Sequence, residues 1–343
     1  MTRRPASVPL PPPAEDIVQR GQWTPVPADD SLVAYVQHEL WPGPHKPIGW
    51  QVARLSAAAY LYREIGTGWT VVAKFYVAKT GDEAVQYAQR EMEMTQMARA
   101  AGLMDGGLRA QQALRVWRGV LLLEYVDGLT LEDLIAIRRH RPGELHPALE
   151  QVARLLATLH STSARSSEAP DFADSVRRAH RLVTELSRGG VLQHQAVIGE
   201  GLHYTIDRWA ARAEMVAYTP ALIHGDATTT NFVFPWQDGC VAIDWERLRV
   251  ADPAADVGRL MAEVAHSVRQ YGGDSDEAED LIEHFFAAYC RAACLTDESE
   301  ALRQRATFFR ASSTLRIARN GWLSRLERTA LVAEALALLA RCH

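Results

Sequence analysis

"LIHGDATTTNFVF" (residues 222–234) and "GCVAIDWERLRVADPAADVGRL" (residues 239–260) are the two runs that decide the fold. In each of them a short apolar segment, of the kind that forms a strand, gives way to a polar cluster. Asn231 follows Asp226 by five residues, and Asp244 follows Asp226 by 18. If the apolar segments pair as a hairpin across "PWQDG", Asn231 at the start of one strand and Asp244 at the end of the other meet at one edge.

This convergence predicts a magnesium site beside a proton acceptor. The amide oxygen of Asn231 and the carboxylate of Asp244 are hard oxygen ligands of the kind that Mg²⁺ takes. Asp226, on the adjoining loop, would lie near enough to receive a proton. Taken singly, each side chain could instead cap a turn, satisfy a loop or cap a helix. Together, at this spacing and with apolar segments on both sides, the three favour a site.

The composition is that of an ordinary globular protein and argues against a polyanionic partner. Of the 343 residues, 48% are hydrophobic and 23% are charged, which fits a chain with a substantial core and two lobes or domains. The net charge is −5, with 37 basic and 42 acidic residues and no long basic block. Nucleic acid and membrane partners are therefore not expected.

The cysteines and the N-terminal residues predict a reducing, cytoplasmic location. Four cysteines do not make a disulfide framework in so long a chain: Cys240, Cys290, Cys294 and Cys342. The N-terminal "MTRRPASVPLPPPAED" lacks the apolar centre of a signal peptide, and no run of about 18 apolar residues follows. The pair four residues apart, Cys290 and Cys294, is expected on one helix, where packing is favoured over zinc binding.

Three regions of different character follow one another along the chain. Residues 1–29 are Pro-rich and predict a tail without regular structure. Residues 30–126 alternate strand-like runs with helices, and the expected elements are a helix at 31–40, strands in "WQVARLSAAAYLYREI" and "WTVVAKFYVA", a helix at 82–101, and strands near "ALRVW" and "GVLLLEYV". Residues 127–343 are mainly helical, with apolar stripes at 147–160, 172–187, 198–213, 255–271, 276–292 and 314–340. The only strands expected there are the short runs that flank the opening motif.

The motif "HGD....N" followed by "IDWE" and "ADPAADVGRL" resembles the aminoglycoside phosphotransferase and choline kinase family, relatives of the eukaryotic protein kinases. The resemblance extends, more weakly, over about residues 30 to 340. It implies an α+β, bilobal protein-kinase-like fold, with a small β-rich N-lobe that carries one main helix and a larger, mostly helical C-lobe. Residues 30–126 would be the nucleotide-binding N-lobe, and residues 127–343 the C-lobe with the catalytic loop, the metal site and the acceptor-binding helices.

The resemblance also implies nucleotide-binding residues in the first lobe. Lys74, in "TVVAKFY", would hold the phosphates, and Glu91 would hold Lys74, although Glu93 would serve if the helix phase differed. Glu124 and Val126, in "LLLEYVDG", would offer backbone groups to the adenine. The loop "ARLSAAAYLYRE" departs from the Gly-rich loop of protein kinases, but Ser56 and its alanine neighbours are small enough for close approach of the backbone to phosphate.

Residues around the catalytic loop are assigned supporting roles. His224 is interpreted as a scaffold residue and not as a base. Asp256, in "ADPAADVGRL", is expected to turn back toward the catalytic loop from a helix that begins near Asp252 or Pro253. "ATTT" after Asp226 replaces the Leu-His-Pro-Gly type of many relatives, which leaves the surroundings of the substrate open.

The predicted function is that of a small-molecule kinase, an ATP-dependent phosphotransferase with an alcohol group as acceptor. Asp226 would orient and deprotonate a hydroxyl group, with Mg²⁺ and ATP or GTP as cofactors. The alternatives are an aminoglycoside-modifying phosphotransferase and a nucleotide-binding pseudokinase that serves as an interaction module. A protein kinase is disfavoured, because no activation segment separates "IDWE" from "ADPAAD".

The acceptor is predicted from the charges of the C-terminal half. An acidic cluster at 274–283 is balanced by arginines in "RIARNGWLSRLER", namely Arg316, Arg319, Arg325 and Arg328. Mixed signs favour a neutral or zwitterionic acceptor, such as a sugar, polyol or amino alcohol, over a polycation of the kanamycin type. Arg319 or Trp322 is expected to reach the acceptor pocket. The same acidic cluster is also typical of a helix start, where acids lie near the positive end of the dipole.

Overall fold

A computed structural model describes residues 10, 12–13, 21–76, 79, 82–104, 106–165, 167–192, 196–296 and 298–340. Contacts among Cα atoms divide the chain into two compact units. We call residues up to 100 together with 110–127 the small unit, and residues 101–109 together with those from 128 onward the large unit. Each unit is described by itself.

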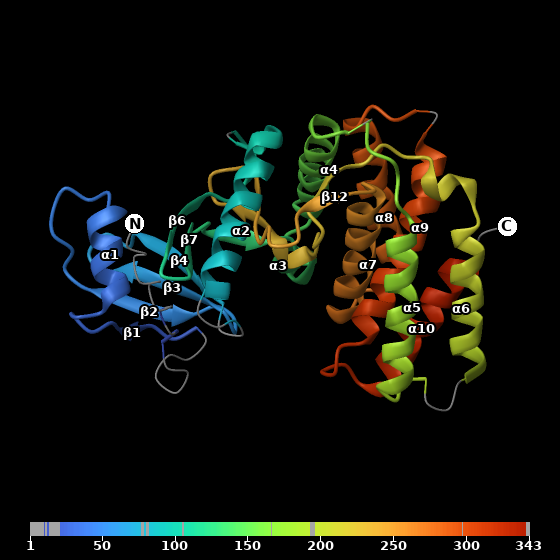
Figure 1. The fold of residues 1–343 in the computed structure, drawn as a ribbon, viewed down its shortest axis with the longest axis horizontal. Coiled ribbons are helices and arrows are strands. Elements are labelled where there is room, and N and C mark those ends of the chain that lie inside the picture. The colour runs from blue at the N-terminus through green and yellow to red at the C-terminus, as the bar shows by residue number, and fades with distance from the viewer. Residues whose placement is uncertain are drawn as a thin grey trace, which may run out of the picture. The chain divides into compact units, whose positions relative to one another are not determined.

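An antiparallel sheet of six strands forms the centre of the small unit (Figure 1). The strands are β1 (Thr24–Pro25), β2 (Trp50–Arg54), β3 (Ala59–Glu64), β4 (Thr70–Phe75), β6 (Ala113–Trp117) and β7 (Val120–Glu124). They lie in the order β1-β2-β3-β4-β7-β6. The predicted meander is confirmed by β2, β3 and β4, which pair with their neighbours in sequence, as in Tyr60 opposite Ala73.

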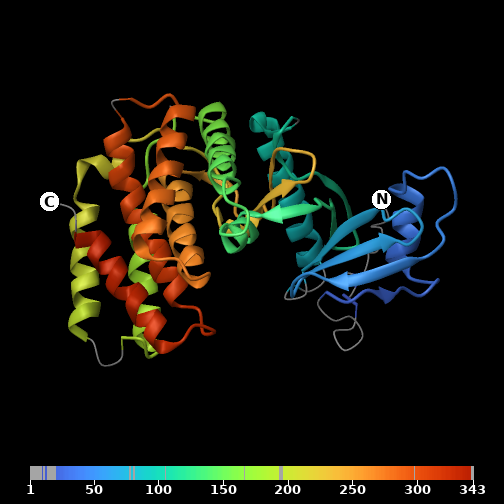
Figure 2. The ribbon, with the colours of Figure 1, turned by 180° about the vertical axis from the view of Figure 1, so that it is seen from behind.

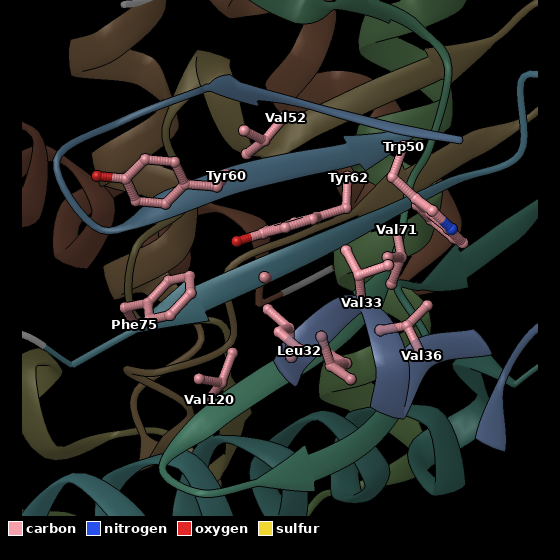
Figure 3. Packing of buried hydrophobic residues seen from close by; sticks show 12 residues of the cluster. Leu32, Val33, Val36, Trp50, Val52, Tyr60, Tyr62, Val71, Phe75 and Val120 are labelled. Carbon is pink, nitrogen blue, oxygen red and sulfur yellow. The ribbon is translucent and has the colours of Figure 1, made fainter. Parts of the chain in front are cut away.

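Two helices cover the two faces of this sheet. Residues at alternate positions of β3 and β4, such as Tyr62 and Phe75, pack with α1 (Ser31–Glu39), as Figure 3 shows. The positions between them, such as Leu61 and Val72, pack with Ala88 of α2 (Asp82–Ala98). Since side chains of a strand alternate between faces, Lys74 lies on the α2 side of the sheet, between two residues that face α1. This alternation fixes the direction of the lysine that the sequence singled out.

Helices make up most of the large unit (Figure 1, and from behind in Figure 2). They are α3 (Leu131–Ile137), α4 (Leu145–Thr162), α5 (Ala173–Arg188), α6 (Ala196–Ala210), α7 (Ala254–Gln270), α8 (Ser275–Ala292), α9 (Ser299–Ala318) and α10 (Arg325–Ala340). α9 packs against both α7 and α10, and α4 packs against α8. The apolar stripe predicted for α4 is buried, as in Val152 and Leu156. The mixed fold, with one β-rich and one helical unit, confirms the predicted fold class.

Short strands in the large unit carry the motif of residues 222–260. A sheet of four strands has the order β5-β11-β10-β8, from β5 (Leu108–Ala110), β11 (Cys240–Ala242), β10 (Phe232–Pro235) and β8 (Gly128–Thr130). The predicted hairpin is confirmed, with Phe232 opposite Ala242 and Val233 opposite Val241. A separate pair joins β9 (Ala221–Ile223) to β12 (Arg249–Ala251).

Some expected elements differ from the structure. The stripe at 314–340 is two helices, since α9 runs from 299 to 318 and α10 starts at 325. The helix α3 and the strands β5, β8 and β12 were not predicted, because elements of three to seven residues give too few turns or alternations to make a pattern. The helix expected at 82–101 passes into a π-helical turn at Arg99–Leu103, where Gly102 has φ +89°.

The predictions for the tail and for the cysteines have mixed outcomes. Most of the Pro-rich tail lies outside the described residues, but Thr24–Pro25 forms β1, so residues 1–29 are not wholly irregular. Cys290 is buried on α8, whereas Cys294 is exposed beyond its end with φ +55°, so the expectation of one shared helix is wrong. Cys342 lies outside the described residues.

No helix among the described residues is long and apolar enough to cross a membrane. The cytoplasmic location stays a prediction.

Candidate active site

Lys74 and Glu91 form an ion pair in the small unit. Lys74 Nζ lies 2.9 Å from Glu91 Oε1, and both side chains are largely buried. The hydroxyl of Tyr76 donates to the other carboxylate oxygen at 2.5 Å, and Thr95 Oγ1 donates to the Glu91 carbonyl at 2.8 Å. The Tyr76 hydroxyl therefore helps to fix the Glu91 carboxylate, which holds the lysine ammonium at its place on the sheet. Glu93 is exposed, which decides between the two glutamates that the sequence left open.

Ser56 and Glu124 are engaged within the small unit. Ser56 Oγ accepts the amides of Ala58 at 3.3 Å and Ala59 at 3.1 Å, which closes the glycine-free turn on itself. The Glu124 amide donates to the Gln112 carbonyl at 3.0 Å, and the Glu124 carbonyl accepts from the Gln111 side chain at 2.8 Å. A carbonyl oxygen has a second lone pair. The phosphate contact of Ser56 and the adenine contacts of Glu124 and Val126 stay predictions.

Asp226 lies in the large unit at the start of a short, tightly bonded loop. The amide of Thr228 donates to the Asp226 carbonyl at 2.8 Å, and the amide of Asn231 donates to the Thr228 carbonyl at 3.0 Å. Thr229 is buried, and its hydroxyl lies 3.2 Å from that of Ser267 on α7. These bonds fix the loop, whereas the Asp226 side chain keeps 15% of its surface exposed. A partly exposed carboxylate on a rigid loop can meet a substrate hydroxyl.

The hairpin brings Asn231 and Asp244 to the same edge, as the sequence predicted. The amide of Ile243, next to Asp244, donates to the Asn231 carbonyl at 3.0 Å. The Asn231 side-chain nitrogen donates to the Asp226 carbonyl at 2.9 Å, which assigns its amide oxygen to the other side, where a cation can use it. Asp244 has φ +64°, in the left-handed region that aspartate adopts more readily than most residues other than glycine. This donor set of one amide and one carboxylate oxygen fits Mg²⁺.

Asp256 holds the backbone of the loop that leads to Asp226, which confirms its predicted direction. Its carboxylate accepts the amides of His224 at 2.6 Å and Gly225 at 2.9 Å, and the ring Nε2 of His160 lies 3.2 Å away. Burial raises the pKa of Asp256, but the hydrogen bonds and the neighbouring histidines outweigh burial and lower it. The ionised carboxylate is thus the form that the site stabilises.

Gly225 occupies a position of the loop that requires both a positive φ and close packing against a neighbouring backbone. Its φ is +77°, and a Cβ here would come within 2.3 Å of the Arg247 carbonyl oxygen. Only glycine combines that conformation with that clearance. His224 is fully buried, and its Nε2 lies 3.0 Å from the Ile243 carbonyl, which fits the scaffold role predicted for it. Its ring lies 4.4 Å from that of Trp245.

Two arginines next to Asp226 were not predicted. The guanidinium of Arg259, on α7, contacts Asp226 Oδ1 directly, and Arg247 Nη1 lies 3.6 Å from the same oxygen. Arg259 lies three residues after Asp256, so helical spacing places both on neighbouring parts of the α7 surface. The sequence therefore did contain a signal for Arg259. Because it lies three positions after Asp256 on a helix, it should face the same loop as Asp256. The pair orients the Asp226 carboxylate.

The expected acceptor residues Arg319 and Trp322 differ in their surroundings. Arg319 pairs with Glu185 at 2.7 Å on the surface. Trp322 lines a hollow of about 840 Å³ in the large unit, together with His266 and Arg310. Arg316, from the same cluster, contacts Glu263 on α7. The positive charges of Arg316 and Arg319 are therefore each matched by a carboxylate.

Comparison with known proteins finds one matching family model. The model described as "Phosphotransferase enzyme family" matches residues 56–307, which is more than half of the chain and includes Lys74, Glu91, Asp226, Asn231, Asp244 and Asp256 but not Arg319 or Trp322. No curated protein sequence matches the chain.

Solved structures share the fold at low sequence identity. The ternary complex of APH(2″)-IIa with streptomycin and ATP has a TM-score of 0.58 and 15% identity, over 91% of this chain and 97% of that one. The GDP and kanamycin complex of another APH(2″) protein has a TM-score of 0.54 and 15% identity, over 90% and 97%. A choline kinase from Cryptosporidium parvum has a TM-score of 0.58 and 13% identity, over 90% and 94%. Identities this low establish the fold and not the substrate.

Proposed function

The chain belongs to the phosphotransferase enzyme family, and we propose that it is a small-molecule kinase that transfers the γ-phosphoryl group of ATP or GTP to a hydroxyl group. The observation that carries this proposal is the fixed loop of Asp226, with two arginines on its carboxylate and a magnesium-type donor set, Asn231 and Asp244, on the hairpin that follows it. The bound nucleotides of the structures with this fold support the choice of phosphoryl donor.

The proposed reaction is an in-line displacement at the γ-phosphorus. Asp226 accepts the proton of the acceptor hydroxyl, whose oxygen forms the new bond to phosphorus. The bond between the γ-phosphorus and the β,γ-bridging oxygen breaks, so that a phosphomonoester and a nucleoside diphosphate result. Such transfer needs mainly alignment and electrostatic stabilisation. The rigid loop and the clamp of Asp256 provide alignment at Asp226.

The other proposed roles concern the nucleotide and its metal. Lys74, positioned by Glu91, neutralises phosphate charge, as a fixed ammonium group does in kinases. Asn231 and Asp244 would hold Mg²⁺, which supplies charge neutralisation to the phosphates when it is bound. We assign nucleotide phosphate binding to the small unit, and proton acceptance and metal binding to the large unit.

The acceptor is proposed to be a sugar, polyol, amino sugar or amino alcohol and not a polycation. Arg316 and Arg319, which suggested mixed charge in the sequence, are paired with carboxylates. Some of the carboxylates in the predicted acidic cluster also have partners within the protein. Asp274 caps α8 by accepting the Glu277 amide at 2.9 Å, and Glu279 contacts Arg310. Carboxylates with such partners have less capacity left for ammonium groups of a substrate.

An ADP-release assay over a panel of hydroxylated compounds, with wild type and Asp226→Asn, tests the proposal. The substitution keeps size and hydrogen bonding but removes the proton acceptor, so turnover should fall by roughly 10² or more while nucleotide affinity changes little. Turnover of Asp226→Asn near the wild-type value would remove Asp226 from the mechanism. Binding of Mg²⁺ and ATP without turnover of any compound would favour a nucleotide-binding pseudokinase, and turnover of aminoglycosides alone would favour the aminoglycoside-modifying alternative.

A further inference from the structure

A small cavity in the large unit lies directly behind the loop of Asp226. Its volume is about 70 Å³, and its walls come from α5, α7, α9 and the β9–β12 pair. Gly225, the residue before Asp226, forms part of the wall. Arg259 lines the same cavity and contacts Asp226. The cavity is thus bounded by the immediate neighbours of the proposed proton acceptor.

Positive charge exceeds negative charge in this cavity. Its charged lining residues are three arginines and one aspartate, namely Arg178, Arg249, Arg259 and Asp256. The Asp256 carboxylate is turned toward the loop amides and His160, and two of the arginines have carboxylate partners elsewhere. Arg178 contacts Asp174, and Arg259 contacts Asp226.

Arg249 differs from the other two arginines. Its Nη1 donates to the Arg247 carbonyl at 3.2 Å, and within the described part of the chain no carboxylate forms an ion pair with it. Burial, followed by the charge of Arg178, lowers the pKa of Arg249, and these influences outweigh the nearby carboxylates of Asp256 and Asp174, which favour the cation. An arginine nevertheless stays charged in proteins. A partly buried cation of this kind gains from a bound anion, since an unpaired charge away from water is costly.

Three hydroxyl groups add further donors. Ser175 of α5 and Ser312 and Ser313 of α9 line the cavity. No hydrogen bond joins these hydroxyls to any other residue that the structure describes. Together with the Arg249 guanidinium they surround the cavity with groups that can donate to oxygen. Such a lining of guanidinium and hydroxyl donors suits a carboxylate or a phosphate.

The space suits an anionic group at the end of a small molecule. A volume of about 70 Å³ is between two and three times the volume of a water molecule in the liquid, about 30 Å³. A second hollow of about 210 Å³ shares Ser175, Arg178 and Arg249 with it. The acids of that hollow are already engaged: Glu168, Asp174 and Asp252 form ion pairs, and Asp171 accepts the amide of Ala173.

We propose that the acceptor of this phosphotransferase carries an anionic group, a carboxylate or a phosphate, which binds to Arg249 and the three serines while its hydroxyl lies at Asp226. The inference rests on the proposed function, because it assigns the acceptor class of the same site. It makes Arg249 a specificity-determining residue that touches the substrate. Within the proposed class of hydroxylated acceptors, it favours compounds that also carry such a group, as sugar acids, hydroxy acids and sugar phosphates do.

A binding experiment tests the anion site without knowledge of the natural acceptor. Malonate and inorganic phosphate are titrated at constant ionic strength against the full chain, saturated with Mg²⁺ and a non-hydrolysable ATP analogue to fill the nucleotide site. Arg249→Gln is compared with Arg177→Gln, which alters an exposed arginine on the same helix as Arg178 that does not line the cavity. The unfolding temperature of each variant without anion checks that it is folded, and Arg249→Lys provides a second variant that retains the charge.

Wild type and Arg177→Gln should bind at least one of the two anions, and Arg249→Gln should bind it about 10- to 100-fold more weakly, the loss expected for one or two hydrogen bonds to a charged group. Arg249→Lys should bind with intermediate affinity. The anion that binds decides between carboxylate and phosphate. Equal affinities in wild type, Arg177→Gln and Arg249→Gln, or no binding to wild type, would overturn the proposal.

Measurements of turnover distinguish a failure of the anion-site proposal from a failure of the kinase proposal. Glycerol, glycerate and glycerol 3-phosphate each offer a primary and a secondary hydroxyl group, together with no anion, a carboxylate and a phosphate respectively. An anionic compound should have a kcat/KM at least tenfold above that of glycerol in wild type, and this preference should disappear in Arg249→Gln. Turnover without any such preference contradicts the anion site and leaves the kinase proposal intact. Anion binding that depends on Arg249 in a protein that turns over no compound would contradict the kinase proposal instead.

Discussion

The clamp formed by Asp256 supports the sharpest prediction. Its carboxylate accepts two loop amides, those of His224 at 2.6 Å and Gly225 at 2.9 Å, and contacts His160 at 3.2 Å. Asp256→Asn keeps the shape but replaces one acceptor oxygen by an NH₂ group, which would point at an N–H donor. At least one of the loop amides then loses its partner in a site from which water is excluded.

The expected cost follows from the value of hydrogen bonds to charged groups. Each contributes about 1.5–3 kcal/mol, so loss of one of them should destabilise the protein by about 1.5–3 kcal/mol. A change of 1 kcal/mol shifts the unfolding temperature of a domain of 150–250 residues by about 2–4 °C, so the shift should be roughly 3–12 °C, and larger if both amides lose their partner. The loop that carries Asp226 should also be less well fixed, and kcat should fall about tenfold or more with little change in nucleotide affinity.

The assay combines thermal unfolding with ADP release, and a matched variant provides the control. Asp207 also contacts a histidine, with Oδ1 2.9 Å from His180 Nε2, but its side chain is 69% exposed. Asp207→Asn should therefore change the unfolding temperature by no more than about 1 °C, because exposed ion pairs contribute little. If Asp256→Asn unfolded at the wild-type temperature and kept the wild-type kcat, the clamp would have no role in fixing the loop.

Three further predictions concern the phosphates, the metal and pH. Lys74→Met should raise the dissociation constant for Mg²⁺ and ATP about tenfold, because one charge-assisted contact to phosphate is lost, and an unchanged constant in calorimetry would refute the assignment. Asp244→Ala should weaken nucleotide binding only when Mg²⁺ is present, and an equal loss in EDTA would refute a metal role. Burial raises the pKa of Glu64, but hydrogen bonds from the amides of Thr67 and Ile48 outweigh it and lower this pKa from 4.5 to about 2. Glu64 thus stabilises the folded state above pH 4.5, and this contribution is lost as the pH falls toward 2. The unfolding free energies of wild type and Glu64→Gln should therefore differ at pH 7 and converge in acid, and a constant difference would refute the sign.

Residues that lie close in sequence made the loop predictable. Asn231 and Asp244 are separated by one hairpin, so the period of the strands and the length of the turn sufficed to bring them to one edge. The direction of Asp256 followed from its place in the first turn of α7. The choice of Glu91 over Glu93 depended on which face of α2 packs against the sheet. The structure shows that Glu91 is buried and that Glu93 is exposed.

Contacts between distant segments could not be predicted in the same way. Arg249, Ser175 and Ser313 come from a strand and two helices, and their meeting depends on how α5 and α9 pack. The acidic and basic clusters of the C-terminal half suggested an acceptor from composition alone, yet several of those charges pair with residues outside both clusters, as Glu279 does with Arg310, Arg316 with Glu263 and Arg319 with Glu185. The break between α9 and α10 was missed because apolar residues continue on both sides of it.

Detection of the phosphorylated product is the most direct test of the central claim, that Asp226 promotes phosphoryl transfer to an alcohol. ³¹P NMR would follow Mg²⁺ and ATP with the acceptor selected from the panel, in the presence of wild type or Asp226→Asn. We predict a new phosphomonoester signal that grows together with ADP in wild type and is at least roughly 10²-fold slower in Asp226→Asn. ADP and inorganic phosphate without a phosphomonoester, or the same rate for both proteins, would contradict the claim.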